Sequence, residues 1–86
     1  MPVKLKLYTR SGCHLCDEML KELEAFRHAG KECFSVEVED IDRDPETRRR
    51  YCLRVPVLTA GESGDVLCEA SFNRQAVQDY LATNTG

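Results

Sequence analysis

Two cysteines, Cys13 and Cys16, are separated by two residues and followed by a segment with helical periodicity. If Cys13 lies at the start of that helix, the unpaired amides of the first turn point outward beside it and stabilise a thiolate. Cys16 then lies nearly one turn later on the same side, close enough for a disulfide. Cys13 can attack a substrate disulfide, and Cys16 can resolve the mixed disulfide that forms. The spacing suits thiol–disulfide exchange, with half of a metal site or two buried thiols as the alternatives.

Charged residues around the pair affect its chemistry in opposite directions. Arg10 adds positive charge near Cys13, which favours the thiolate, whereas Asp17 and Glu18 oppose it weakly if they face water. His14, between the cysteines, leaves three roles open. It could be a neutral side chain that only varies the redox potential, a group that transfers a proton or stabilises the thiolate, or a metal ligand.

The other cysteines, Cys33, Cys52 and Cys68, are scattered along the chain. An odd total of five, without a signal peptide, argues against a disulfide framework of the secreted kind. A structural zinc site usually needs four ligands in two pairs, and a second Cys-x-x-Cys is absent. We therefore expect these three cysteines to pack as small apolar side chains, with no metal bound.

Composition narrows the class of partner. The 86 residues form one expected domain, 1–86, and carry a net charge of −3, which argues against nucleic acid as the main partner. The basic cluster Arg48–Arg50 would project in three directions on a helix, as a solvated face or as a contact for an anionic partner. No segment resembles a signal peptide or a membrane span. We expect a cytoplasmic monomer without membrane contact.

Periodicity along the chain predicts a β-α-β-α-β-β-α order. Apolar and polar residues alternate in 3–8, and apolar residues then recur at helical spacing up to about Ala29, before Gly30. Asp44 and Pro45 suit the start of a short helix that ends near Leu53. The remaining expected elements are a strand at 34–39, a short apolar run at 55–59, a hairpin loop at 60–65, a strand at 66–70, a last helix capped by Ser71 or Asn73, and a frayed end at 83–86. The proline at position 56 would normally place a strand at the edge of a sheet.

Three segments in this order and spacing, YTRSGCHLCDEM, DIDRDPE and RVPVL, resemble a glutaredoxin. The likeness extends from Val3 to about Leu81 and is strongest to small bacterial glutaredoxin-like proteins of the thioredoxin superfamily. It implies an α/β thioredoxin fold, a four-stranded mixed sheet flanked by helices. It also implies that Pro56 is cis and packs beside the cysteines, and that the backbone of Val55 bonds an extended thiol substrate. Cys13 is the implied nucleophile and Cys16 the implied resolving thiol.

Several positions differ from the usual glutaredoxin pattern. His14 and Leu15 stand where glutaredoxins typically have Pro-Tyr, and Arg54 replaces the usual threonine before Val-Pro. Residues 69–73 lack the Gly-Gly and acidic residue that hold the γ-glutamyl end of glutathione. Arg10 does stand near the family's basic residue, so glutathione stays open as a co-substrate.

We therefore predict a thiol–disulfide oxidoreductase, without a tightly bound cofactor, that acts on a protein or small-molecule thiol or disulfide. The alternatives are a module that binds thiol partners, an iron–sulfur cluster or a metal, and a thioredoxin-fold adaptor with little turnover. The electron donor, the substrate and the reduction potential are left open by the sequence.

Overall fold

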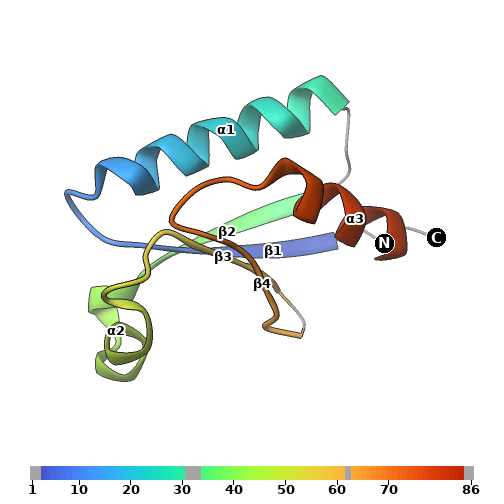
Figure 1. Ribbon diagram of the computed structural model, residues 1–86. Helices are drawn as coiled ribbons and strands as arrows, with labels where there is room; N and C mark the ends of the chain where they lie inside the picture. The colour runs from blue at the N-terminus through green and yellow to red at the C-terminus, as the bar shows by residue number, and fades with distance from the viewer. Residues whose placement is uncertain (1–2, 31–33, 62, 85–86) are drawn as a thin grey trace.

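The computed structural model describes residues 3–30, 34–61 and 63–84, and this part of the chain forms one sheet with helices on both of its faces (Figure 1). Its elements follow the predicted order. They are β1 (Val3–Thr9), α1 (His14–Gly30), β2 (Phe34–Asp40), the short 3-10 helix η1 (Ile41–Arg43), α2 (Pro45–Tyr51), β3 (Val57–Ala60), β4 (Val66–Glu69) and α3 (Arg74–Asn84).

The sheet has the strand order β2-β1-β3-β4. β1 and β2 are parallel, with α1 as the crossover between them, and β3 and β4 are antiparallel to their neighbours. α1 and α3 cover one face of the sheet, and α2 lies on the other face, at the end where β1 finishes (Figure 1). The turn that carries Cys13 starts at this end as well, where Arg10 bonds to Asp42 of η1.

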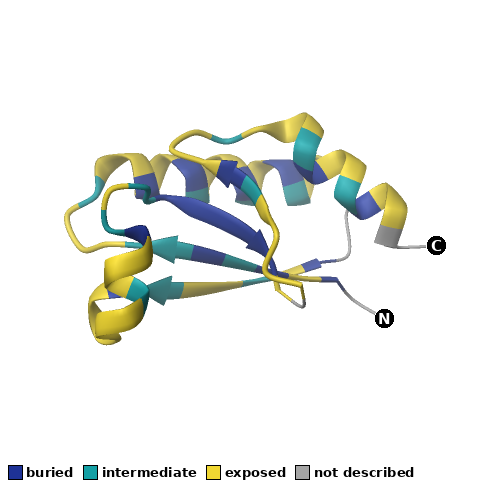
Figure 2. Ribbon diagram, turned by 60° about the horizontal axis from the view of Figure 1, so that its bottom comes forward, coloured by how far each residue is buried: buried dark blue, intermediate teal, exposed yellow. Residues whose placement is uncertain are grey.

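The alternation in β1 and the apolar face of α1 form the main core, as predicted. Leu5 and Leu7 of β1 are buried against Met19 and Leu23 of α1. Figure 2 shows the same division, with buried positions on the side of α1 that faces the sheet and exposed positions on its outer side. The core thus fixes where β1 ends and where α1 begins, and both ends frame the Cys13–Cys16 segment.

A second apolar cluster lies beneath α2. Ile41, Tyr51 and Val57 are its buried members, and the ring of Tyr8 stacks on Tyr51 with centroids 4.3 Å apart. The Asp44 side chain caps α2 by accepting the Glu46 amide, as the sequence predicted. α2 ends at Tyr51 rather than near Leu53 because the next residues turn sharply.

Pro56 does not place its strand at the edge of the sheet, although a proline within a strand normally would. β3 starts only at Val57 and lies between β1 and β4. Pro56 precedes the strand, so its missing N–H removes no ladder hydrogen bond. Its carbonyl accepts the amide of Ala70 at 2.8 Å, and the Val55–Pro56 peptide is cis.

The last part of the chain differs slightly from expectation. β4 ends at Glu69, one residue early, because Ala70 adopts a left-handed conformation with φ of 69°. Asn73, one of the two predicted caps, accepts the Ala76 amide at 3.2 Å. Thr83 was predicted to fray, but it belongs to α3 and its hydroxyl donates to the Asp79 carbonyl; residues 85 and 86 lie outside the described part.

No helix in the described ranges is long and apolar enough to cross a membrane.

Candidate functional site

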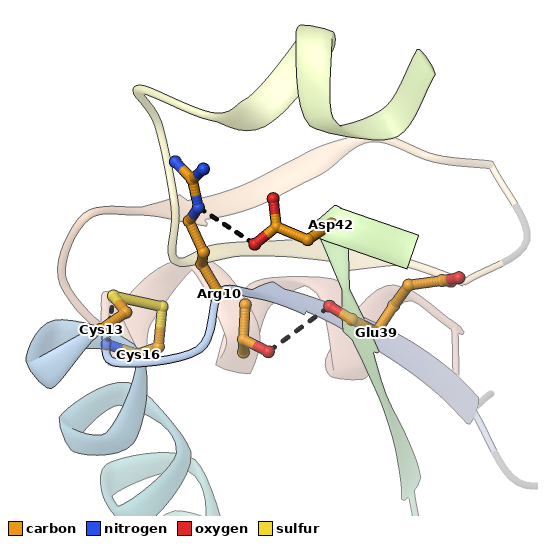
Figure 3. The surroundings of a disulfide bond; sticks show 6 residues. Arg10, Cys13, Cys16, Glu39 and Asp42 are labelled. Carbon is orange, nitrogen blue, oxygen red and sulfur yellow. Dashed lines mark hydrogen bonds and ion pairs between the residues drawn. A yellow bond between two sulfur atoms is a disulfide. The ribbon is translucent and has the colours of Figure 1, made fainter. Parts of the chain in front are cut away.

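Cys13 and Cys16 are joined by a disulfide, with their Cα atoms 5.2 Å apart (Figure 3). A turn at Ser11 and Gly12 connects β1 to them. Gly12 has φ of 79°, a left-handed conformation that glycine adopts without strain, and the Cys13 amide closes the turn by donating to the Arg10 carbonyl at 3.1 Å. The turn thus places Cys13 just before the first residue of α1.

The two sulfurs have different surroundings. Cys13 is half-buried, whereas Cys16 is only 2% exposed. The backbone N–H of Cys16 donates to Cys13 Sγ at 3.1 Å. This amide belongs to the first turn of α1, where the N–H groups have no intrahelical partner and the dipole favours negative charge. A backbone donor in such a place is of the kind that stabilises a thiolate, and it lies beside Cys13, the more exposed of the two cysteines.

Arg10 supports the turn rather than the sulfurs. Its Nε donates to the Asp42 carboxylate of η1 at 3.1 Å, and Figure 3 shows the side chain extending toward η1. The Thr9 hydroxyl donates to the Glu39 carbonyl at 3.4 Å. These two bonds tie the end of β1 to the end of β2. The positive charge of Arg10 is therefore balanced by a carboxylate.

His14 lies on the outer face of the first turn of α1. Its side chain is 84% exposed, and Nε2 lies 3.2 Å from the Glu18 carboxylate one turn later. The ring thus faces water and an acidic partner on α1.

Val55 and Pro56 form the loop that leads into β3. The Val55 amide donates to the Tyr51 carbonyl at 3.1 Å, so this N–H is already paired within the chain. Arg54, the residue before, bonds the Glu69 carboxylate through Nε and Nη2 at 3.1 and 2.8 Å. Its guanidinium also lies 5.3 Å from the centroid of the Tyr51 ring. The loop is held from both sides, by α2 and by the end of β4.

Comparison with known proteins assigns the chain to a family. Residues 4–82 match the family model described as glutaredoxin-like domain, DUF836. The chain belongs to this glutaredoxin-like family. No curated protein matches it significantly.

Solved structures agree with the assignment. The solution structure of protein Ne2328 from Nitrosomonas europaea is 38% identical, covers 93% of this chain and 92% of its own, and superposes with a TM-score of 0.81. Protein XcR50 from X. campestris is 33% identical, with 92% and 96% covered and a TM-score of 0.67. Thioredoxin 1 from Thermosipho africanus, at 16% identity, 96% and 99% coverage and a TM-score of 0.61, shows the fold alone. The glutaredoxin-like domain has a thioredoxin-like α/β fold.

Metal ligands are not gathered in the described ranges: within 3–30, 34–61 and 63–84, no three His, Cys, Asp or Glu side chains are placed to hold one ion. Cys33, one of the dispersed thiols, lies outside these ranges. Cys52 is half-buried against the cluster under α2, and Cys68 is buried in the main core. The packing role predicted for Cys68 is confirmed, and that for Cys52 holds in part.

Cys68 of the glutaredoxin-like domain is a shielded thiol. It is 3% exposed, and Sγ both accepts the Asn73 amide at 3.2 Å and donates to the Asn73 carbonyl at 3.5 Å. Burial raises the pKa of this thiol above its ordinary value of 9.0, and the Asn73 amide opposes the rise. The folded protein therefore keeps the Cys68 proton to a higher pH than the unfolded chain does.

We expect iodoacetamide to alkylate Cys52 well before Cys68 in the oxidised, folded protein. Cys68 should react at least about a hundredfold more slowly than in urea, because only opening of the core exposes it. Since the folded pKa is raised, the unfolding free energy that Cys68 contributes is complete below about pH 9 and declines as the pH rises through the folded pKa. Mass spectrometry of labelled peptides measures both thiols. Equal labelling of Cys52 and Cys68 would contradict the burial of Cys68.

Proposed function

We propose that this glutaredoxin-like domain is a thiol–disulfide oxidoreductase in which Cys13 is the nucleophile and Cys16 the resolving thiol. The observation that carries the proposal is the hydrogen bond from the Cys16 amide to Cys13 Sγ, together with the burial of Cys16. It supports an accessible sulfur with a stabilised thiolate and a shielded one held beside it. Family membership supports the same chemistry.

The proposed reaction balances as two exchanges. The Cys13 thiolate attacks one sulfur of a substrate disulfide, which forms a mixed disulfide and releases the other substrate sulfur as a thiolate. The Cys16 thiol loses its proton to water or to the released thiolate, and its sulfur then attacks Cys13 Sγ. The second substrate sulfur leaves, and the Cys13–Cys16 disulfide of the structure remains. The substrate gains two electrons and the protein loses two.

The proposed role of Val55 is to hydrogen-bond an extended substrate through its backbone, and only its carbonyl is free of the bond to Tyr51. Because its N–H donates to Tyr51, a substrate strand meets the Val55 carbonyl or has to displace that bond. Pro56, which is buried directly after Val55, immediately precedes β3. Glutathione remains a proposed electron donor, to be compared with a thioredoxin reductase system.

We expect glutathione buffers of graded potential to interconvert the Cys13–Cys16 dithiol and disulfide reversibly in a two-electron transition. Thiol labelling and mass spectrometry measure the midpoint. Reduction of hydroxyethyl disulfide is then followed with each electron donor. A pair that cannot be cycled would contradict the proposal. Cycling without turnover with either donor would instead favour the adaptor role.

A further inference from the structure

A groove on the glutaredoxin-like domain starts at Leu15, the residue before Cys16, and follows one side of α1. A narrow hollow of about 50 Å³ opens into a wider one of about 320 Å³, and both share Glu22 and Phe72. We call the two together the α1 groove. Its α1 wall is a single helical stripe, made of residues Leu15, Glu18, Met19, Glu22, Ala25, Phe26 and Ala29.

The opposite wall of the α1 groove is the connection between β4 and α3, which runs alongside α1 in Figure 1. Ala70 and Ser71 line the narrow part, and Phe72 contacts the ring of Phe26, with centroids 5.9 Å apart. Ala70 is also bonded to the Pro56 carbonyl. One backbone hydrogen bond therefore ties this wall of the groove to the loop proposed to receive substrate, and Leu15 at the start of the groove lies directly before Cys16.

The α1 groove has an acidic end and a basic end. Glu18 and Glu22 line the narrow part near the dithiol, and Glu22 has no ion-pair partner among the described residues. At the far end Arg74 lies over the Phe26 ring, 5.6 Å from its centroid. The wide part between them is mostly apolar. A complementary ligand carries a positive charge near its reactive sulfur, then an apolar group, and then a negative charge.

Length and charge exclude a small anionic thiol as the best fit. The stripe from Leu15 to Ala29 rises about 21 Å, which equals about six residues of extended chain. Glutathione is shorter, and its net negative charge does not match the carboxylates of Glu18 and Glu22 in the narrow part. The nearby cations, Arg10 and Arg54, are already bonded to Asp42 and Glu69.

We propose that the α1 groove binds an extended cysteine-containing segment of a substrate protein, with a basic residue next to the cysteine, an apolar side chain in the wide part and an acidic residue near Arg74. This inference rests on the proposed function, because the bound segment delivers its disulfide to Cys13. It makes the order of charges along the segment, rather than its composition, the basis of selection.

The test uses two peptides of identical composition, Cys-Lys-Ser-Leu-Ser-Asp and Cys-Asp-Ser-Leu-Ser-Lys. Each is also made with its whole sequence reversed, so that the cysteine stands at the carboxyl end and keeps the same neighbour. Each is joined as a mixed disulfide to thionitrobenzoate, whose release by the reduced protein is followed by absorbance. In at least one of the two sequence directions, we expect the peptide with lysine next to cysteine to react about fivefold faster at low salt than the peptide with aspartate there. This difference in rate should disappear at high salt.

Two variants with the same change of charge test whether the α1 groove is the site that distinguishes the peptides. Glu22→Lys should abolish or reverse the preference, whereas Glu24→Lys, on the same helix but outside the groove, should retain it. Equal rates for the matched peptides in both directions, with hydroxyethyl disulfide still reduced, would overturn this inference alone. Failure to reduce hydroxyethyl disulfide as well would overturn the proposed function and the inference with it.

Discussion

Replacement of Cys13 by serine is expected to abolish disulfide reduction, by a thousandfold or more, on the order of the loss when a covalent nucleophile is removed. Cys16→Ser should behave differently. It keeps the half-buried Cys13 sulfur and its backbone donor, so the first exchange proceeds and the mixed disulfide accumulates. The asymmetry follows from burial, since Cys16 is 2% exposed and cannot meet a substrate disulfide itself.

Intact-protein mass spectrometry after exposure to glutathione disulfide, or to a peptide disulfide, measures this difference. A background with Cys33→Ser and Cys52→Ser removes two other cysteines as sources of unrelated adducts. Two variants serve as controls. Cys13→Ser should stay unmodified at Cys16, and the double variant with Cys16→Ser, which lacks both cysteines of the pair, gives the background. An adduct on Cys16 in the Cys13→Ser protein, formed as fast as the one on Cys13, would contradict the assignment of roles.

Local sequence patterns were sufficient for most of the fold. The alternation in β1 and the three-to-four spacing in α1 each state which side chains are buried, because both depend on residues close together in the chain. The position of Cys13 before a helix follows from the same reading. The cap by Asp44 and the helix start at Pro45 are likewise local chemistry.

Contacts between distant segments could not be predicted in this way. The bond between Arg10 and Asp42 depends on the parallel register that pairs Thr9 with Asp40, which no local pattern specifies. The pairing of Arg54 with Glu69 depends on the turn after α2. The sequence suggested Arg10 as a charge near the thiolate, and the structure adds that this charge has a carboxylate partner.

The position of Pro56 shows why a local rule failed. A proline inside a strand pattern indicates an edge, because it cannot donate to a neighbouring strand. Here the apolar run from Val55 to Thr59 is divided: the first two residues form a loop, and the strand begins after the proline. The strand can therefore be central, and the loop remains at the end of the sheet beside the dithiol turn.

Leu7→Ala is expected to lower the free energy of unfolding by about 3–5 kcal/mol, a large part of the roughly 4–13 kcal/mol typical of a domain of this length. Leu7 is fully buried in β1, where it pairs with Val38 on one side and Leu58 on the other. Truncation removes its apolar contacts and leaves a cavity between the sheet and α1 that these two packed layers cannot easily close.

Leu53→Ala is the matched control, because it makes the same chemical change at a side chain that is 96% exposed. It should change the unfolding free energy by no more than about 0.5 kcal/mol. Urea unfolding of both variants measures the change in unfolding free energy at each position. The Cys13–Cys16 disulfide is kept oxidised so that every sample has the same cross-link. Similar midpoints for Leu7→Ala and the wild type would contradict the core described for β1. Because β1 leads directly into the dithiol turn, reduced Leu7→Ala protein should also lose disulfide reductase activity at a urea concentration that Leu53→Ala withstands.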